Sequence, residues 1–142
     1  MAVAEKFVGT WTFVEAENFD AYLKQIRVGM IMRTIAKNLK PTIIISSDGN
    51  KWKIVSESNF RRHIWEFVLG EEIAETTPDG RQVKSKFFLE GDVLVQLESA
   101  TKAGDKSTRF ERYIDEQGRL IIVCDCEGVV AKRIYKREEA SN

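Results

Sequence analysis

The sequence predicts an all-β protein, a ten-stranded antiparallel up-and-down β-barrel that uses residues 1–142 as a single domain. From residue 43 onward, apolar and polar residues alternate with a period of two, which is typical of strands. Glycine-containing turns separate these segments at regular intervals, and one helical interruption lies near the start. This spacing fits a sandwich or a closed barrel. We favour the closed barrel, because consecutive hairpins then leave no free sheet edge.

The N-terminal part of the chain combines the first strand with the helical interruption. Apolar residues alternate along Phe7–Ala16, which predicts a strand. Asn18 is then expected to cap a short helix whose apolar residues recur at helical spacing. Gly29 separates this helix from a second one over Met30–Asn38. Pro41 ends the helical region, because the residue before a proline disfavours helical geometry.

The remaining strands follow one another through short turns. Asp48-Gly49-Asn50 is a strong hairpin signal, and a longer loop covers residues 100–106. With about ten strands the barrel interior is too wide for side chains alone to fill, so we expect a ligand cavity. The predicted strands are 43–47, 51–56, 60–69, 73–77, 81–89, 92–98, 108–115, the segment between Gly118 and Glu127, and 129–137.

Two arginines lie on the apolar faces of the last strands. In Val129–Arg137, alternation places Arg133 and Tyr135 on the side opposite the lysines. In Thr108–Asp115, Arg112 shares its face with a phenylalanine and an isoleucine. A cation that faces a protein interior costs free energy unless an anion is enclosed with it. The pattern therefore indicates a buried anion that contacts both arginines.

Composition excludes several function classes. Basic and acidic side chains number 22 each and are mixed along the chain, so there is no basic field for nucleic acid. Cys124 and Cys126 lie too close together for a disulfide framework, which indicates buried thiols in a reducing compartment. The N-terminal segment lacks the apolar run of a signal peptide, and no stretch approaches a membrane span in length. We expect a soluble, cytoplasmic protein.

Motifs for catalysis or cofactor binding are missing from the sequence. It contains no nucleophile elbow, metal-ligand cluster or phosphate loop. We therefore expect neither an enzyme nor a protein with a cofactor or a metal. His63 has no metal-ligand partner at suitable spacing and is expected to lie at the surface. Trp11, Trp52 and Trp65 are interpreted as core or strand-face aromatics.

Several short motifs occur between Phe7 and Lys136. They are Phe7-Val8-Gly9-Thr10-Trp11, Asn18-Phe19-Asp20, Lys40-Pro41-Thr42, Ser56-Glu57-Ser58-Asn59-Phe60, Leu69-Gly70-Glu71-Glu72, Glu75-Thr76-Thr77-Pro78-Asp79-Gly80-Arg81-Gln82-Val83-Lys84-Ser85 and Arg133-Ile134-Tyr135. In their order and spacing they resemble the intracellular lipid-binding proteins, the family of fatty-acid-binding and cellular retinoid-binding proteins. The resemblance implies a ten-stranded β-clam with a helix-turn-helix lid after the first strand.

The resemblance also implies a site for a ligand carboxylate. Many members hold it with two arginines and a tyrosine, and the matching positions here are Arg112, Arg133 and Tyr135. Retinol-binding members have glutamine at one or both arginine positions, so two arginines point to a carboxylate. The chain departs from the family pattern twice: the loop over residues 100–106 is longer than usual, and Arg27 replaces a usual glycine. Because this loop precedes Arg112, Arg109 is the competing choice, and alternation favours Arg112.

The family pattern suggests a carrier of long-chain fatty acids or related acidic lipids. Retinoic acid is the near alternative, because it could use the same two arginines and tyrosine. A purely structural or interaction module is a third choice. The expected contacts of the ligand tail or the cavity opening are Phe19, Val28, Phe60, Asp79, Arg81, Ile122 and Cys124.

We expect the protein to be a monomer. We also expect its lid to contact further partners. Lys24 and Lys37 would steer the lid to anionic membranes for transient contact. Delivery to a nuclear receptor is an open alternative, since some family members carry three basic lid residues for import into the nucleus. Lys24 and Arg33 match two of these positions, while Thr34 stands at the third and Lys37 lies one turn away.

Overall fold

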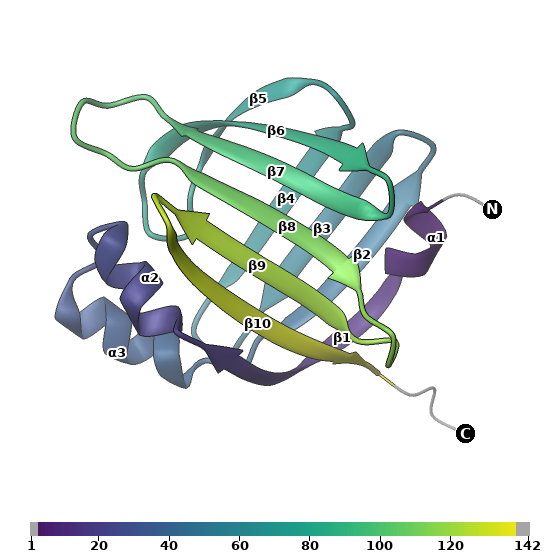
Figure 1. Ribbon diagram of the computed structural model, residues 1–142, viewed down its shortest axis with the longest axis horizontal. Coiled ribbons are helices and arrows are strands. Elements are labelled where there is room, and N and C mark those ends of the chain that lie inside the picture. Colours follow the sequence, from purple (N-terminus) through teal and green to yellow (C-terminus); the bar gives the residue numbers. More distant parts are fainter. Residues whose placement is uncertain (1–2, 139–142) are drawn as a thin grey trace.

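Ten antiparallel strands form a single sheet in the computed structural model, which describes residues 3–138 (Figure 1). Apart from β4 and β5, strands that follow each other in the sequence pair with each other, and β1 also pairs with β10. The predicted up-and-down connectivity is therefore confirmed. The elements are α1 (Ala4–Phe7), β1 (Gly9–Glu17), α2 (Phe19–Gln25), α3 (Met30–Asn38), β2 (Thr42–Asp48), β3 (Lys51–Glu57), β4 (Arg62–Val68), β5 (Glu72–Thr76), β6 (Gln82–Glu90), β7 (Val93–Ala100), β8 (Thr108–Ile114), β9 (Leu120–Cys126) and β10 (Val129–Arg137).

The barrel is nearly closed, and this corrects the expectation of full closure. The sheet order runs from β4 through β1 and β10 to β5, so β4 and β5 are the two ends of the sheet and do not pair with each other. Side chains span this opening instead: the rings of Phe67 on β4 and Phe87 on β6 stack with centroids 3.6 Å apart. One backbone hydrogen bond, from Gly70 N to Phe87 O at 2.8 Å, ties the β4–β5 turn to β6.

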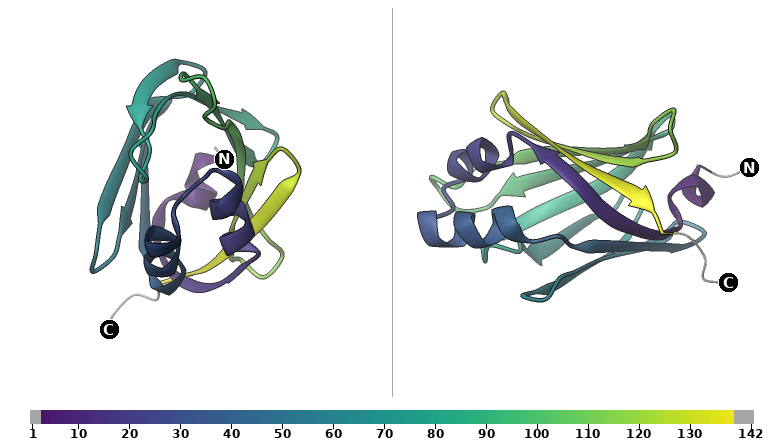
Figure 2. Two further views of the ribbon diagram at one scale, coloured as in Figure 1. Left: turned by 90° about the vertical axis from the view of Figure 1, so that its left-hand side faces the viewer. Right: turned by 90° about the horizontal axis from the view of Figure 1, so that it is seen from below.

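Helices α2 and α3 cover one end of the barrel, as the lid prediction requires (Figure 2). Asn18 precedes α2 but does not cap it with its side chain, which corrects the predicted N-cap. Its backbone is left-handed, with φ 58°, and its Nδ2 donates to the carbonyl oxygen of Val130 at 2.9 Å. Asn18 therefore ties the start of the lid to β10 rather than to the helix.

A short helix, α1, lies at the opposite end of the barrel and was not predicted (Figure 2). Phe7, expected in the first strand, is its last residue and is fully buried. The Trp11 Nε1 donates to the carbonyl oxygen of Phe7 at 2.9 Å, which fixes α1 against the start of β1. This helix closes the end of the barrel that the lid does not cover.

The two departures from the family pattern lie next to each other in space. Arg27, between α2 and α3, adopts a left-handed φ of 69°, a conformation that glycine takes most easily. Its guanidinium approaches Gly104 in the loop between β7 and β8. The arginine and the longer loop thus meet at the lid, and Lys106 of the same loop bonds Glu127 at 3.0 Å.

Hydrophobic packing divides the interior into two halves. The half next to α1 is filled by large aromatic and aliphatic side chains, whereas the half under the lid contains the cavity described below. In the filled half, Phe7 meets Trp52 edge-on and Trp52 stacks on Phe67. These three aromatic residues lie outside the wall of the cavity under the lid.

Candidate functional site

A cavity of about 260 Å³ lies under the lid. Its volume is close to the lower end of the range for ligand pockets, about 300 Å³. Helices α2 and α3 and the inward faces of the strands form its mostly apolar wall. Every residue that the sequence singled out for a ligand contributes to this wall: Arg112, Arg133, Tyr135, Phe19, Val28, Phe60, Asp79, Arg81, Ile122 and Cys124.

Strand register places Arg112, Ile122 and Arg133 in one row across β8, β9 and β10. Ile122 is the cross-strand partner of Arg112 on one side and of Arg133 on the other. Neighbouring strands are about 4.8 Å apart, so the two arginine Cα atoms are separated by about 10 Å. Both guanidinium groups can thus reach a single small anion between them. We call these three residues the arginine row.

Arg133 is held by its neighbours in the barrel wall. Its Nε donates to the hydroxyl oxygen of Tyr135 at 3.1 Å. Its guanidinium carbon lies 4.9 Å from the ring centroid of Phe13 and 4.3 Å from that of Phe19. These cation–π contacts stabilise a charge that is largely removed from water. Because Phe19 belongs to α2, Arg133 also joins the lid to the floor of the cavity.

Arg112 is buried without a hydrogen-bond partner. It is 5% exposed, and within residues 3–138 its Nε and Nη1 find no acceptor. The rings of Phe87 and Phe110 lie 5.8 and 5.6 Å from its guanidinium carbon. Burial lowers the pKa of Arg112 to about 10, because the charged form is deprived of water. The group remains charged at neutral pH, and the carboxylates of Glu75 and Glu98 favour its charged form from beyond salt-bridge distance.

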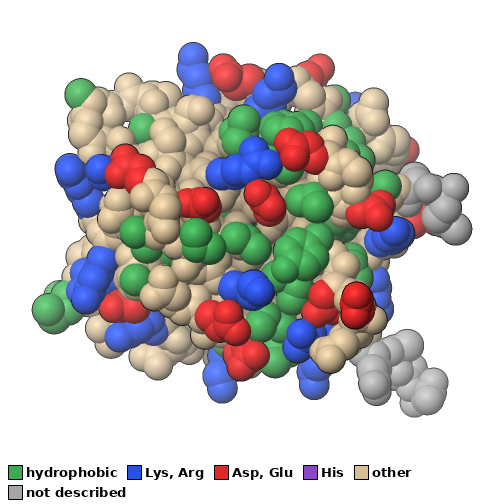
Figure 3. Space-filling model, in the orientation of Figure 1, with side chains coloured by type: hydrophobic (Ala, Val, Ile, Leu, Met, Phe, Trp, Pro, Cys, Tyr) green, Lys and Arg blue, Asp and Glu red, His purple; other side chains and the backbone are tan. Residues whose placement is uncertain are grey.

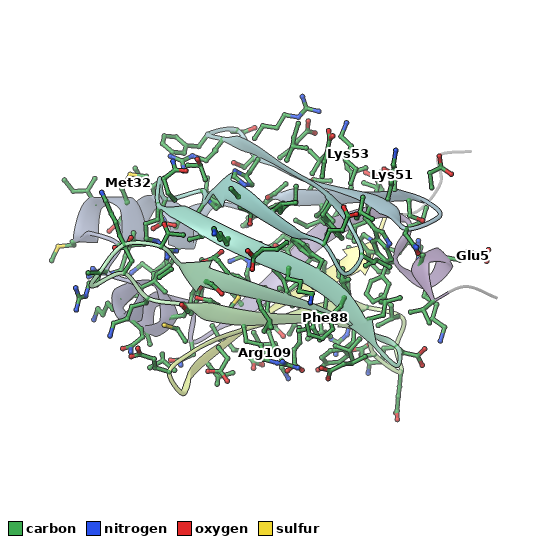
Figure 4. All side chains as sticks on the ribbon, turned by 90° about the horizontal axis from the view of Figure 1, so that it is seen from above. Glu5, Met32, Lys51, Lys53, Phe88 and Arg109 are labelled. Atoms are coloured by element: carbon green, nitrogen blue, oxygen red, sulfur yellow. The ribbon has the colours of Figure 1, made fainter. Side chains whose placement is uncertain are left out.

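Arg109, the competing choice, points away from the cavity. Its Nε donates to Glu111 at 2.9 Å, and its Nη2 lies 3.4 Å from Glu90 on the outer face of the sheet. These neighbours raise the pKa of Arg109. Alternation along β8 thus gave the correct inward arginine, and the longer loop before β8 did not shift its register. Figure 4 labels Arg109 together with Met32, which belongs to the lid helix α3.

A second polar group lines the cavity near the turn between β5 and β6. Arg81 bonds Asp79 at 2.6 Å and approaches Glu98 at 3.4 Å. Its hydrogen bonds lower the pKa of Asp79 despite partial burial, so this carboxylate stays ionised. Arg81 already has acidic partners, unlike Arg112. The two polar residues predicted for the cavity are therefore paired with each other rather than open to a ligand.

Glu98 and Gln96 were missed by the sequence analysis. Both lie on β7, are almost fully buried, and line the cavity. Burial raises the pKa of Glu98 to about 7, and the nearby Arg81 charge opposes part of that rise. The alternation along β7 could have identified both residues, because Gln96 and Glu98 share one face of the strand with the apolar Leu94.

His63 was expected at the surface but lies in the cavity wall, which corrects that prediction. Its ring meets the ring of Trp65 edge-on, with centroids 4.3 Å apart. Partial burial, followed by the charge of Arg61, lowers the pKa of His63, so the imidazole is neutral at neutral pH. Cys124 is also buried in the wall, and burial raises the pKa of its thiol to about 12. The His63 imidazole and the Cys124 thiol are therefore uncharged parts of the cavity wall.

The visible outer face of the barrel in Figure 3 shows no concentration of one charge. On the face formed by β6 to β10, basic and acidic side chains are interspersed with hydrophobic ones (Figure 3). Among residues 3–138, no group of three histidine, cysteine or acidic side chains is placed to hold a metal ion. None of the helices within that range is long and apolar enough to cross a membrane.

The fold and its interior define a helix-covered β-barrel with an internal, mostly apolar ligand cavity. Residues 8–138 match the Lipocalin / cytosolic fatty-acid binding protein family, and the chain belongs to this family. Members of the fatty-acid-binding branch are lipid carriers rather than enzymes, in agreement with the expectation that this chain does not catalyse a reaction.

Individual relatives agree with this assignment. Fatty acid-binding protein homolog 5 of Caenorhabditis elegans is 41% identical over 95% of this chain and 98% of its own length. The apo structure of lipid binding protein 8 from the same species has a TM-score of 0.91 and 28% identity, covering 94% of this chain and 96% of that one. A Schistosoma mansoni fatty acid binding protein in complex with arachidonic acid has a TM-score of 0.89 and 30% identity, covering 97% and 100%. The chain is thus a homologue of fatty-acid-binding proteins.

Proposed function

We propose that this protein binds long-chain fatty acids, or closely related acidic lipids, as a carrier, with the carboxylate held by Arg112, Arg133 and Tyr135. The observation that carries the proposal is the buried, unpartnered guanidinium of Arg112 in the wall of an apolar cavity. An arginine cannot be neutralised at working pH, and its planar fork matches a carboxylate. A bound carboxylate would supply the missing acceptor and counter-charge.

Tail and head group would contribute differently to binding. About fifteen methylenes leaving water, at about 0.8 kcal/mol each, give about 12 kcal/mol before the costs of association. A hydrogen bond to a charged group contributes about 1.5 to 3 kcal/mol net. The tail would therefore supply most of the affinity. The arginines would fix the orientation and select acids over alcohols.

The test is displacement of a fluorescent fatty acid from delipidated protein by palmitate and by hexadecanol. These competitors have the same number of carbons and differ in the head group. Palmitate should bind about ten- to a hundredfold more tightly, because only its carboxylate pairs with the arginines. Equal affinities would refute the head-group assignment. Failure of both to displace the probe would refute lipid binding and favour a structural or interaction module.

Retinoic acid is a second candidate, because aromatic rings form part of the wall beside the tail. Phe19, Trp65 and the neutral His63 line the cavity and could pack against a conjugated chain. Competition of the bound probe by oleate and by all-trans retinoic acid separates the two ligands. Native mass spectrometry of lipid co-purified from cells would then identify the natural one.

Delivery of the ligand to membranes is part of the proposal. At the start of α3, Met30 and Ile31 are 73% and 78% exposed, and Phe60 beside the cavity is 53% exposed. Exposed apolar side chains with basic neighbours are typical of surfaces that contact lipid headgroups. Lys24 and Lys37 provide such neighbours on α2 and α3. We propose a cytosolic carrier whose lid touches anionic membranes transiently.

Import into the nucleus, with delivery to a receptor, is proposed as a separate outcome. Three basic residues surround one carboxylate of the lid: Asp20 lies 3.2 Å from Arg33, 3.7 Å from Lys24 and 4.0 Å from Lys37. This cluster retains a net positive charge. Imaging of the protein in cells with and without added lipid tests the proposal, and a distribution that lipid does not change would refute it.

A further inference from the structure

Two buried polar side chains of β7 lie along the cavity, away from the arginine row. Gln96 is 1% exposed, Glu98 is 4% exposed, and both line the cavity. Leu94, on the same face, is the cross-strand partner of Arg112. With a rise of about 3.3 Å per residue, Gln96 and Glu98 lie about 7 and 13 Å from that position along the strand. Both side chains would thus face the acyl chain rather than the head group.

Gln96 has an acceptor without a partner. Its Nε2 lies 3.5 Å from the Glu75 carboxylate and 3.4 Å from the Ser85 hydroxyl oxygen. Both contacts are at the outer limit of a hydrogen bond, and they place the amide nitrogen, rather than the oxygen, beside Glu75 and Ser85. In the described part of the chain, the Gln96 Oε1 has no hydrogen-bond partner. A buried carbonyl oxygen without a partner costs free energy unless a donor reaches it.

Glu98 extends the same polar strip toward the lid. Its Oε1 lies 3.4 Å from the Arg81 Nη2, at the outer limit of a hydrogen bond, while Arg81 bonds Asp79 more closely. Across the sheet, Glu98 pairs with Thr108, whose hydroxyl is 3.1 Å from that of Tyr22. Because burial raises its pKa to about 7, Glu98 is present in both proton states near neutral pH. It can therefore accept a hydrogen bond or donate one.

We infer that Gln96 and Glu98 form a second polar subsite, which binds a hydroxyl group carried part-way along the acyl chain of a fatty acid. The inference rests on the proposed function, because it requires the carboxylate to lie at the arginine row. A hydroxyl can donate to the Gln96 oxygen and also bond either form of Glu98. An unsubstituted methylene at that position leaves the Gln96 oxygen without a partner and offers no hydrogen bond to Glu98. The subsite thus favours hydroxylated over plain fatty acids.

An ordered water could satisfy Gln96 in the free protein. A methylene that displaced such a water would not reproduce its hydrogen bonds, whereas a hydroxyl would. The same preference for the hydroxylated lipid therefore follows. If the water instead stays beside the bound lipid, the protein does not prefer the hydroxylated lipid. The binding measurement below distinguishes a displaced water from a retained one.

The test compares three competitors of a fluorescent fatty acid on delipidated wild-type protein. They are stearic acid, a stearic acid hydroxylated in the middle of its chain, and one hydroxylated next to the carboxylate. One net hydrogen bond of about 1 kcal/mol corresponds to about a fivefold change in affinity. The mid-chain hydroxy acid should bind at least about fivefold more tightly than the other two.

Variants assign the effect to the subsite. Gln96→Leu and Glu98→Leu should each reverse the order, so that stearic acid binds more tightly than its mid-chain hydroxy derivative. Glu111→Leu removes a carboxylate from the outer face of β8 and should leave the ratio of affinities unchanged. Because the readout is a ratio, loss of folded protein lowers every signal without changing the order.

The wild-type measurement decides the question even when a variant does not fold. If the mid-chain hydroxy acid binds no more tightly than stearic acid, while acids still bind more tightly than alcohols, the subsite is refuted and the proposed function stands. If none of the three acids displaces the probe, the proposed function is refuted and the subsite with it.

Discussion

Replacement of Arg112 by methionine should change stability and ligand affinity in opposite directions. The side chain is buried, and among the described residues its guanidinium makes no salt bridge, although the charges of Glu75 and Glu98 act on it from a greater distance. A one-unit change in pKa corresponds to 1.36 kcal/mol. Lowering the pKa of Arg112 to about 10 therefore means that its buried charge costs the folded, lipid-free protein about 3 kcal/mol.

The aromatic neighbours offset part of this cost. Phe87 and Phe110 each provide a cation–π contact, and such contacts contribute about 0.5 to 1 kcal/mol. Methionine fills a similar volume without a charge. Arg112→Met should therefore raise the free energy of unfolding of the lipid-free protein by about 1 to 2 kcal/mol. It should also weaken oleate binding about ten- to a hundredfold, because the charged hydrogen bonds to the carboxylate are lost.

Guanidinium chloride unfolding of delipidated protein measures the first effect, and calorimetric titration with oleate measures the second. The matched control is Arg109→Met on the same strand. Arg109 lies on the outer face with its side chain 38% exposed, so its loss should change the free energy of unfolding by less than about 0.5 kcal/mol and leave oleate binding unchanged. If Arg112→Met destabilised the lipid-free protein, or bound oleate as tightly as the wild type, the proposal that Arg112 is a buried charge that binds the ligand carboxylate would be wrong.

Three further predictions concern the head group, a buried acid and the lid. Arg133→Gln should weaken palmitate binding and narrow the preference for palmitate over hexadecanol in the displacement assay; an unchanged preference would contradict its role. Glu98 has its pKa raised to about 7 from an ordinary value of 4.5, so the folded protein binds a proton that the unfolded chain releases between these values. Wild-type stability should therefore fall as pH rises from about 4.5 through 7, by as much as about 3 kcal/mol, and unfolding of Glu98→Gln across this range should show a smaller slope, which Glu75 maintains because burial raises its pKa too. An equal slope in both proteins would rule out Glu98 as its source. Replacing Lys24 and Lys37 by glutamine should slow transfer of bound lipid to anionic vesicles and leave transfer to zwitterionic vesicles unchanged; the proposed steering is wrong if transfer by the wild type does not respond to anionic lipid content.

The strands could be predicted from the sequence because their signals are local. Apolar alternation and glycine-containing turns place all ten strands within about two residues of their observed bounds. Closure could not be predicted, since β4 and β5 alternate like the other strands and pairing depends on how the whole sheet curves. Helix α1 is only four residues long, too short for a periodic pattern, and Asn18 took part in a tertiary hydrogen bond that no local pattern shows.

The residues of the cavity wall that could be predicted from the sequence are charged residues on otherwise apolar strand faces. Arg112 and Arg133 were recognised because alternation placed each of them among hydrophobic neighbours. The same alternation places Gln96 and Glu98 inward, on a strand face that is otherwise apolar. Their importance depends on partners from other strands, Glu75 and Arg81 among them, which sequence spacing does not bring together.

The edges of β4 and β5 leave the circumference of the barrel without a continuous backbone ladder. A sheet closed by hydrogen bonds all the way round has a fixed circumference, whereas here the circumference is completed by side chains such as the stacked Phe67 and Phe87. These two edges can move apart without breaking a hydrogen bond of the ladder. Widening of this seam would therefore enlarge the cavity of about 260 Å³ without the loss of a ladder hydrogen bond.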